Sequence, residues 1–254
     1  MNLFSLEGRI ALVTGGSRGI GRMIAKGLLC QGAKVYIVAR TSNVCDATAK
    51  ELSAFGPCIS IPCDISTKEG ITQLVRQLSE KEKHLDILIN NAGTVWGAPF
   101  DEFPESGWDR VVDLNMKTPF FLTQALAPML RQASTRNMAK VVNIASVDGI
   151  SVCPYEDYSY AASKAGIIHL TKRMSLQLIN DKICVNAIAP GAFISEMNAE
   201  IRDNSASVAL RIPAKRIGRE EDIASAAIYL SSSASDYVVG HTLIVDGGIT
   251  LTRN

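Results

Sequence analysis

Short apolar runs rich in β-branched residues alternate along the chain with longer segments in which apolar and polar residues mix. Nearly continuous apolar runs are typical of parallel strands covered on both faces, and the amphipathic segments between them are typical of helices. The predicted strands cover residues 9–15, 34–40, 58–64, 86–93, 140–146, 183–190 and 242–248. The predicted helices include residues 19–31, 66–83, 108–132, 158–180 and 220–232.

This regular alternation predicts an α/β fold, a Rossmann-type doubly wound parallel sheet with helices on both faces. The chain has 254 residues, 47% of them hydrophobic, which suits one domain over residues 1–254 and is too short for two comfortable domains. The least regular stretch, residues 192–218, is polar and follows the sixth strand. We predict that it forms a mobile substrate lid, because binding residues often lie on such loops.

The net charge and the pattern of cysteines argue against several classes of function. The formal net charge is +1, so no net field holds the protein on nucleic acid or on an anionic membrane. The six cysteines form no CxxC pair and the three histidines lie far apart, so we expect no metal site, no disulfide framework and a reducing, cytoplasmic location. No apolar run approaches the roughly 20 residues of a membrane span, and we expect no signal peptide.

A glycine-rich loop, "TGGSRGIG", covers residues 14–21 between the first strand and the first helix. Gly15, Gly19 and Gly21 allow a tight turn and let backbone N–H groups approach a pyrophosphate at the helix N-terminus. The alternative is a glycine-rich turn without a ligand. Its position after the first strand of a βαβ unit favours dinucleotide binding.

The end of the second strand indicates which dinucleotide is bound. A site for NAD usually ends that strand with an acid on the ribose 2′-hydroxyl, but here Ala39 and Arg40 stand there. Arg18 lies inside the glycine loop, and two guanidinium groups without an acid suit a 2′-phosphate. The residues therefore predict NADPH/NADP+ as the cofactor. The alternative is that both arginines are solvated surface charges.

Several motifs in sequence order resemble the short-chain dehydrogenase/reductase family over nearly the whole chain. "TGGSRGIG" is similar to its TGxxxGxG loop, "NNAG" (90–93) to its signature after the fourth strand, and "YAASK" (160–164) to its YxxxK motif. Asn115 in a helix, Ser146 at the end of the fifth strand and "PG" (190–191) after the sixth complete the resemblance. It implies a seven-stranded parallel sheet, reversible hydride transfer between a nicotinamide and a carbonyl or alcohol, and commonly a homotetramer (or dimer).

Tyr160 and Lys164 lie four residues apart, which places both on one face of a helix. A neighbouring ammonium is expected to lower the phenol pKa from its usual value of roughly 10, making Tyr160 the proton donor in reduction. By resemblance, Lys164 also binds the nicotinamide ribose, Ser146 hydrogen-bonds the substrate oxygen, and Asn115 holds a water linking Lys164 to solvent. Each residue alone has an ordinary structural alternative, such as a turn, a cap or an amphipathic helix face.

Two further tyrosines lie near this motif. At about 100° per residue, Tyr160 lies about 40° from Lys164 around the helix, whereas Tyr158 lies about 120° away on the other side. Tyr155 follows Pro154 and is expected to precede the helix. Neither shares the face of the lysine, so we predict that Tyr155 lines the substrate pocket and that Tyr158 packs.

The resemblance also implies further cofactor contacts. Asp64 matches an acid that contacts adenine, although "DIST" also reads as a turn before a helix. Asn90 and Ala92 match a strand end beside the cofactor ribose, and Ser195 stands where the family often has threonine. The implied cofactor set is Gly15, Ser17, Arg18, Gly19, Ile20, Gly21, Arg40, Asp64, Ile65, Asn91, Ala92, Gly93, Tyr160, Lys164, Pro190, Gly191, Phe193 and Ser195.

The substrate is indicated only by overall similarity. "PGAFISEM" and the segment from Ile212 to Gly248 resemble 3-oxoacyl-carrier-protein reductases, and "NAGTVWGAPFDEFPESGWDRVVDLN" suggests a branch linked to hydroxyacyl lipid synthesis. An acyl chain needs an apolar trough and a carrier protein a basic patch. The candidate substrate residues are Val95, Trp96, Val147, Ile150, Tyr155, Phe193 and Met197. The candidate patch residues are Lys117, Arg131 and Arg136.

Three alternatives stay open at this stage. Relatives with similar C-terminal segments act on sugars, steroids or other small ketones. A NAD-dependent alcohol dehydrogenase is opposed by Ala39 and Arg40. A catalytically silent dinucleotide-binding regulatory protein is opposed by the presence of Ser146, Tyr160 and Lys164, since such relatives typically lose the tyrosine or lysine.

Overall fold

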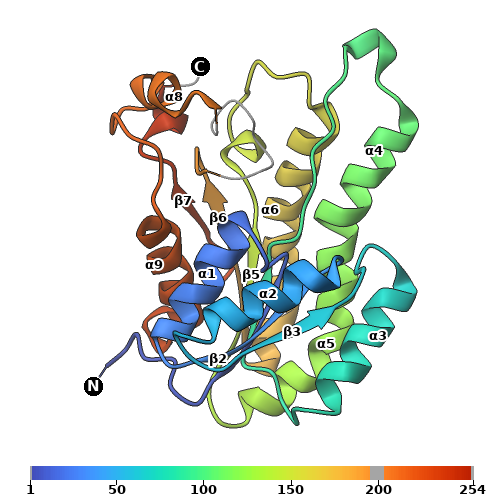
Figure 1. Cartoon of the computed structure of the whole chain (residues 1–254), viewed down its shortest axis with the longest axis vertical. Helices are drawn as coiled ribbons and strands as arrows, with labels where there is room; N and C mark the ends of the chain where they lie inside the picture. Colours follow the sequence, from blue (N-terminus) through green and yellow to red (C-terminus); the bar gives the residue numbers. More distant parts are fainter. Residues whose placement is uncertain (1, 195–202, 253–254) are drawn as a thin grey trace.

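A computed structural model describes residues 2–194 and 203–252 of the chain (Figure 1). Its strands form one parallel seven-stranded sheet in the order β3-β2-β1-β4-β5-β6-β7, which confirms the predicted fold class. The strands are β1 (Ile10–Thr14), β2 (Lys34–Ala39), β3 (Cys58–Pro62), β4 (Ile87–Asn90), β5 (Ala139–Ile144), β6 (Ile183–Pro190) and β7 (Thr242–Val245). Six of them lie inside their predicted runs, and β5 begins one residue before its predicted run at 140.

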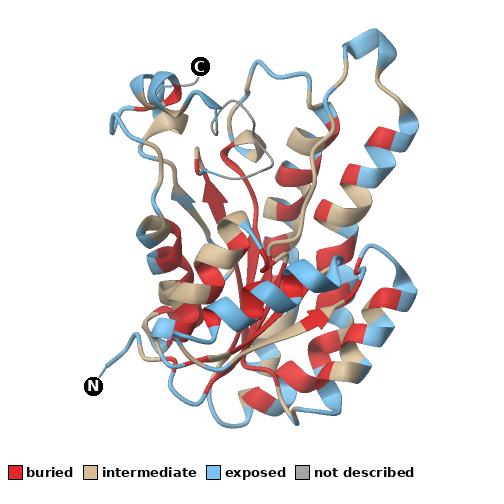
Figure 2. Ribbon diagram, viewed as in Figure 1, coloured by how far each residue is buried: buried red, intermediate tan, exposed pale blue. Residues whose placement is uncertain are grey.

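Helices cover both faces of the sheet, and the central strands between them are buried (Figure 2). Alternate residues of the strands point to opposite faces. In β1, Ala11 and Val13 pack on one side, while Ile10 and Leu12 pack on the other. The first side carries α1 (Gly19–Cys30), α2 (Ser42–Leu52) and α9 (Glu220–Ser231). The second side carries α3 (Lys68–Ser79), α5 (Thr118–Ser134) and α6 (Tyr158–Leu178).

The predicted helix over residues 108–132 is in fact interrupted. Helix α4 (Glu105–Val112) is followed by a π-helical turn, η2 (Asp113–Lys117), before α5 begins at Thr118. A π turn inserts one residue into a helix and frequently occurs at a functional site. Apolar spacing could not reveal it, because the helical pattern resumes on the far side.

Part of the predicted lid falls on residues 195–202, outside the described residues. In the described part, Phe193 pairs with Gly218 in an isolated β-bridge and α8 (Ser205–Arg211) follows. Val208 and Ile212 are buried together in a small cluster of their own. A lid function for this segment stays a prediction.

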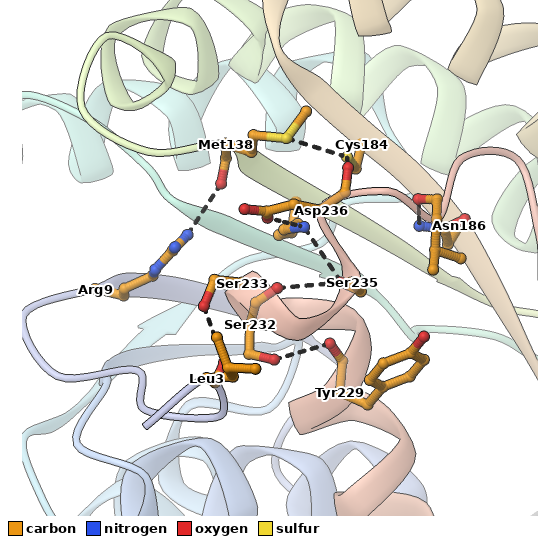
Figure 3. Close-up of polar contacts among 12 residues, drawn as sticks. Leu3, Arg9, Met138, Cys184, Asn186, Tyr229, Ser232, Ser233, Ser235 and Asp236 are labelled. Atoms are coloured by element: carbon orange, nitrogen blue, oxygen red, sulfur yellow. Dashed lines mark hydrogen bonds and ion pairs between the residues drawn. The ribbon is translucent and has the colours of Figure 1, made fainter. Parts of the chain in front are cut away.

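A network of polar contacts joins the segments at the amino-terminal ends of the strands (Figure 3). The Lys140 side chain is fully buried, and its Nζ lies 2.7 Å from Asp236 Oδ1 and 3.2 Å from Ser235 Oγ. Beside it, Arg9 Nη1 donates to the Met138 carbonyl oxygen at 3.0 Å. These contacts join the segments that enter β1, β5 and β7, at the sheet edge opposite the carboxyl ends of the strands.

Within residues 2–194 and 203–252, no helix combines the length and apolarity that a membrane span requires. The same residues contain no cluster of three or more histidine, cysteine, aspartate or glutamate side chains suited to a metal ion. All six cysteines are free thiols.

Candidate active site

A cleft of about 540 Å³ opens at the carboxyl ends of β1 to β5. It spans the point between β1 and β4 where the strand order reverses, which is where ligands bind in open α/β sheets. Most of the predicted cofactor residues line it, namely Gly15, Ser17, Arg18, Gly19, Ile20, Gly21, Arg40, Asp64, Ile65, Asn91, Ala92, Gly93, Tyr160 and Lys164.

The glycine loop is folded closely against the end of β4. Gly15 and Gly19 have φ of +63° and +51°, in the left-handed region that favours glycine. A Cβ on Gly15 would lie 2.9 Å from the Asn91 side-chain nitrogen, and one on Gly21 would collide with the Gly15 carbonyl oxygen. The Asn91 amide holds the loop by donating to the Thr14 carbonyl oxygen at 2.9 Å. At Gly15 and Gly21 the backbone of the loop and of the first turn of α1 therefore faces the cleft without a side chain.

Positive charge gathers at the end of the cleft formed by β1 and β2. Arg18 and Arg40 both line this end and both are exposed, and Ala39 leaves the strand end without an acid. The nearby acid, Asp64, accepts hydrogen bonds from Ser66 N at 3.0 Å and Ser66 Oγ at 2.7 Å. Burial pushes the pKa of Asp64 upward, but these bonds and the charge of Arg40 outweigh it and leave that pKa below its ordinary value.

Asp64 thus stabilises a turn before a helix, which is the structural alternative that the sequence offered for it. It shapes the turn before α3, whose first residues are capped by Thr67 Oγ1, which accepts from Gly70 N at 3.0 Å. It also lines the cleft, so the turn and a ligand contact are compatible. The adenine contact itself stays a prediction.

Tyr160 and Lys164 meet at the other end of the cleft, one turn apart on α6. Lys164 Nζ lies 5.5 Å from the centre of the Tyr160 ring and donates to the Ile144 carbonyl oxygen at 2.7 Å. Burial lowers the pKa of Lys164 to about 8, against the opposing charge of Asp148. Burial also raises the pKa of Tyr160, although a hydrogen bond with Ser146 acts against this.

The expected lowering of the Tyr160 pKa by its lysine neighbour is therefore wrong for the chain on its own. Desolvation of the phenolate outweighs the hydrogen bond with Ser146, and the charges of Asp148 and Asp157 add to the rise, whereas Lys164 is not among the groups that shift this pKa. The raised pKa favours the neutral phenol, which is the form that can give up a proton.

Ser146 is both a turn residue and a neighbour of Tyr160. It follows β5 and caps the short 3-10 turn η3 (Val147–Gly149), where its Oγ accepts from Asp148 N at 3.1 Å. The same hydroxyl hydrogen-bonds Tyr160. The turn role that the sequence left open is thus present, and the contact of Ser146 with a substrate oxygen stays a prediction.

Asn115 lies in the η2 turn and is 2% exposed. Its Nδ2 donates to the Thr94 carbonyl oxygen at 2.9 Å and to Ser163 Oγ at 3.1 Å, while its Oδ1 accepts from Thr94 N at 2.8 Å. The side chain thereby fastens the loop after β4 to α6. The predicted water between Asn115 and Lys164 stays a prediction.

Several predicted residues lie away from the cleft. Phe193 is 3% exposed with its ring against Gly218, and Val147 is 3% exposed in the η3 turn; neither lines the cleft as the sequence led us to expect. Pro190 and Gly191 end and follow β6 without lining it. Ser195 and Met197 lie outside the described residues.

The aromatic residues near the cleft divide into two groups. The Trp96 ring lies against Gly107, with the Arg110 guanidinium 5.8 Å from its centre, so it anchors the loop on α4; its predicted substrate contact is untested. Tyr158 packs edge-to-face on Phe100 and Phe103, both at 5.6 Å, which confirms a packing role. Tyr155 is 45% exposed just before α6 and keeps its prediction as a pocket residue.

The predicted basic patch does not form at the entrance of this chain's cleft. Lys117 pairs with Asp113, Arg131 with Asp181, and Arg136 contacts His84. Arg131 lies in the last turn of α5 and Arg136 beyond it, near the start of β5. Because a strand starts at the sheet edge opposite its carboxyl end, these two arginines lie on the far side of the sheet from the cleft.

Sequence reasoning missed several residues that line the cleft. Thr94 and Leu114 adjoin the NNAG motif and Asn115, so widening those motifs by one residue would have found them. Val44 and Cys63 had no signal, because nothing in their local pattern distinguishes them from core residues. Asp148, two residues after Ser146, does not line the cleft but acts electrostatically on Tyr160 and Lys164, and no motif in the sequence distinguishes it.

The similarity to known proteins covers nearly the whole chain and therefore the whole site. Residues 15–250 match the family described as Enoyl-(Acyl carrier protein) reductase. The chain is 46% identical to the Rhamnolipids biosynthesis 3-oxoacyl-[acyl-carrier-protein] reductase of Pseudomonas aeruginosa over 98% of each chain. It is 36% identical to the 5-keto-D-gluconate 5-reductase of Escherichia coli K12, again over 98% of each.

Solved structures show the same two kinds of relative. The Pseudomonas aeruginosa RhlG/NADP active-site complex matches with a TM-score of 0.95 and 45% identity, covering 98% of this chain and 99% of that one. A gluconate 5-dehydrogenase from Burkholderia cenocepacia, in complex with NADP and tartrate, matches with a TM-score of 0.90 and 33% identity over 98% of each chain.

Proposed function

The chain belongs to the short-chain dehydrogenase/reductase family, and on that premise we propose that it is an NADPH-dependent carbonyl reductase that converts a 3-oxoacyl thioester to the 3-hydroxyacyl product. One observation carries this proposal. A single cleft joins a glycine loop flanked by Arg18 and Arg40 to a buried lysine beside a neutral tyrosine.

The cleft fits NADPH by the chemistry of its lining. A pyrophosphate would lie on the backbone N–H groups between Gly15 and Gly21, where the absence of side chains lets it approach. Arg18 and Arg40 would hold the 2′-phosphate, since a guanidinium binds phosphate through two parallel hydrogen bonds. Lys164 would hold the nicotinamide ribose. The relatives that were solved as NADP complexes support this assignment.

The chain's own contribution to the chemistry is orientation and one proton. Bound NADPH supplies a hydride for the carbonyl carbon. The carbonyl oxygen then needs a proton, and the Tyr160 hydroxyl is the donor at this end of the cleft. Ser146, which contacts Tyr160, would hydrogen-bond the same oxygen, and Lys164, held by the Ile144 carbonyl oxygen, would add positive charge where negative charge develops.

The thioester substrate is supported by the relative with 46% identity, which is named as a 3-oxoacyl-[acyl-carrier-protein] reductase. Apolar side chains at the tyrosine end of the cleft, including Val95 and Leu114, suit an acyl chain. We take either a carrier protein or coenzyme A as the thioester's carrier. A sugar-acid ketone is the second candidate, because relatives with 36% and 37% identity are named for gluconate chemistry.

A substrate panel tests this proposal. Purified protein is given NADPH or NADH with 3-oxoacyl thioesters of several chain lengths, 5-keto-D-gluconate and a steroid ketone, and nicotinamide absorbance is followed. We expect thioesters with NADPH to give the highest kcat/KM. Preferred turnover of the sugar acid or steroid would replace the substrate assignment. Cofactor binding without turnover of any ketone would instead favour a regulatory protein.

We also infer a cytoplasmic location, because the free thiols fit a reducing compartment. A homotetramer (or dimer) is proposed from the family. Exposed apolar side chains on α5 support it, since Phe120 and Phe121 lie edge-to-face at 5.2 Å with substantial exposure. Light scattering of the purified protein measures the oligomeric state directly.

A further inference from the structure

The η3 turn places the Asp148 carboxylate near Tyr160 and Lys164, and the backbone packing of the turn fixes the position of this carboxylate. Asp148 is half-buried in the middle of this turn. The next residue, Gly149, is so close to α6 that an added Cβ would lie 2.6 Å from the Lys164 carbonyl oxygen. The turn is therefore packed directly on the helix that carries Tyr160 and Lys164, which holds Asp148 next to both.

The Ser146 hydroxyl links this carboxylate to Tyr160. Its oxygen accepts from Asp148 N at 3.1 Å, and its proton is donated to Asp148 Oδ2 at 3.3 Å. A serine hydroxyl has one proton and two acceptor sites, so one acceptor site is left for the Tyr160 hydroxyl that it also contacts. While the Ser146 proton lies on Asp148, the remaining acceptor site can take the Tyr160 proton; the opposite direction, in which Ser146 donates to Tyr160 and lowers its pKa, requires that proton to leave Asp148.

The first direction has a chemical consequence. A Tyr160 phenolate would need the single proton of Ser146 for itself, and that proton would have to leave Asp148. We propose, resting on the reductase function above, that Asp148 is a positioning residue that competes for the Ser146 proton and so holds Tyr160 as the proton donor. It acts through Ser146 and touches neither substrate nor cofactor in this role.

The charges around Tyr160 agree with this inference. Asp148 from η3 and Asp157 from the residue before α6 both raise the pKa of Tyr160, and Lys164 faces it from the next turn. From the loop after β4 and from η2, the nearby cleft residues are uncharged, namely Thr94, Val95 and Leu114. The remaining cleft charges, Arg18, Arg40 and Asp64, follow strands β1 to β3 at the other end.

The test variant is Asp148→Asn, which keeps the shape and the backbone N–H but removes the charge and weakens the acceptor. Ionisation of Tyr160 is followed by the tyrosinate ultraviolet difference spectrum of the binary complex with NADP+, with Tyr160→Phe as baseline. We expect the midpoint to fall by about one pH unit. The control Asp157→Asn removes a comparable charge without a bond to Ser146, so we expect a smaller fall.

A second readout is the pH profile of kcat/KM for oxidation of the 3-hydroxyacyl thioester. Oxidation requires deprotonated Tyr160, so its rise with pH should move to lower pH in Asp148→Asn by the same amount. If Asp148→Asn does not fold, Asp148→Ala replaces it. An unchanged or raised midpoint, or a larger fall in Asp157→Asn, would overturn the proposal. The spectroscopic titration needs no substrate, so a wrong substrate assignment leaves it valid, and failure to bind NADP+ would count against the reductase instead.

Discussion

Lys164 Nζ lies 5.5 Å from the centre of the Tyr160 ring and is held there by a 2.7 Å hydrogen bond to the Ile144 carbonyl oxygen. The carbonyl group belongs to the last residue of β5, so a strand end positions a side chain of the helix that follows. The ammonium is thereby fixed in a buried place where its charge acts at short range. This arrangement leads to the first prediction.

Replacing Tyr160 by Phe removes only the hydroxyl. We expect kcat for carbonyl reduction to fall by about 10²- to 10⁴-fold, the range of general acid catalysis, with NADPH affinity largely retained. Steady-state kinetics and calorimetric titration with NADPH measure the two effects. Tyr158→Phe is the matched control, because Tyr158 packs on Phe100 and Phe103 away from the lysine. A fully active Tyr160→Phe variant would refute the assignment.

Cofactor preference should depend on the two cleft arginines. Arg40→Ala removes a charge-assisted contact to the 2′-phosphate, so we expect kcat/KM with NADPH to fall by about 10- to 100-fold while the value with NADH changes little. Arg18→Ala should act in the same direction. Arg22→Ala is the control, since Arg22 pairs with Glu51 and does not line the cleft. Equal losses with both cofactors would show that Arg40 does not recognise the phosphate.

Asn115→Ala should lower both stability and activity. It removes three hydrogen bonds that join the loop after β4 to α6, and we expect the free energy of unfolding to fall by about 2–3 kcal/mol. Because Thr94 and its neighbours line the cleft, kcat should fall as well. Urea denaturation and kinetics measure these effects, with the exposed Asn137→Ala as control. A stable, active variant would contradict the fastening role.

The network at the other sheet edge should govern stability without affecting catalysis. Asp236→Asn leaves the fully buried Lys140 without its ion-pair partner, and we expect a loss of about 3 kcal/mol in the free energy of unfolding. The double variant Lys140→Met/Asp236→Asn should recover most of that loss, because the buried charge is gone. Kinetics at low temperature should stay unchanged in both. A change in cofactor preference would show that the two sheet edges are coupled.

The fold and the cofactor loop could be predicted because they rest on local patterns. Seven apolar runs mark the seven strands of the parallel sheet, and the spacing of Gly15, Gly19 and Gly21 marks the turn between β1 and α1. The phenol pKa could not be predicted, since desolvation of Tyr160 depends on how closely η3 and α6 pack. For the same reason the burial of Phe193 against Gly218 was missed: the two are far apart in sequence, and only tertiary contact brings them together.

Substrate contacts were the least predictable part of the site. Trp96 lies on Gly107 of α4, a contact that no motif encodes. The basic residues Arg131 and Arg136 share a segment with Lys117, yet a helix of this length carries them to the opposite edge of the sheet. Proximity in sequence therefore misled us about proximity to the cleft.

Gly149 has a practical consequence for redesign. Its Cα lies against the backbone of Lys164, so any larger residue there would push on the helix turn that carries the ammonium. A mutant library meant to change substrate scope can vary the exposed residues from Ile150 to Tyr155, which lie in the segment between η3 and α6. Position 149 is best kept as glycine in such a library, because substitutions there are expected to give inactive variants rather than new specificities.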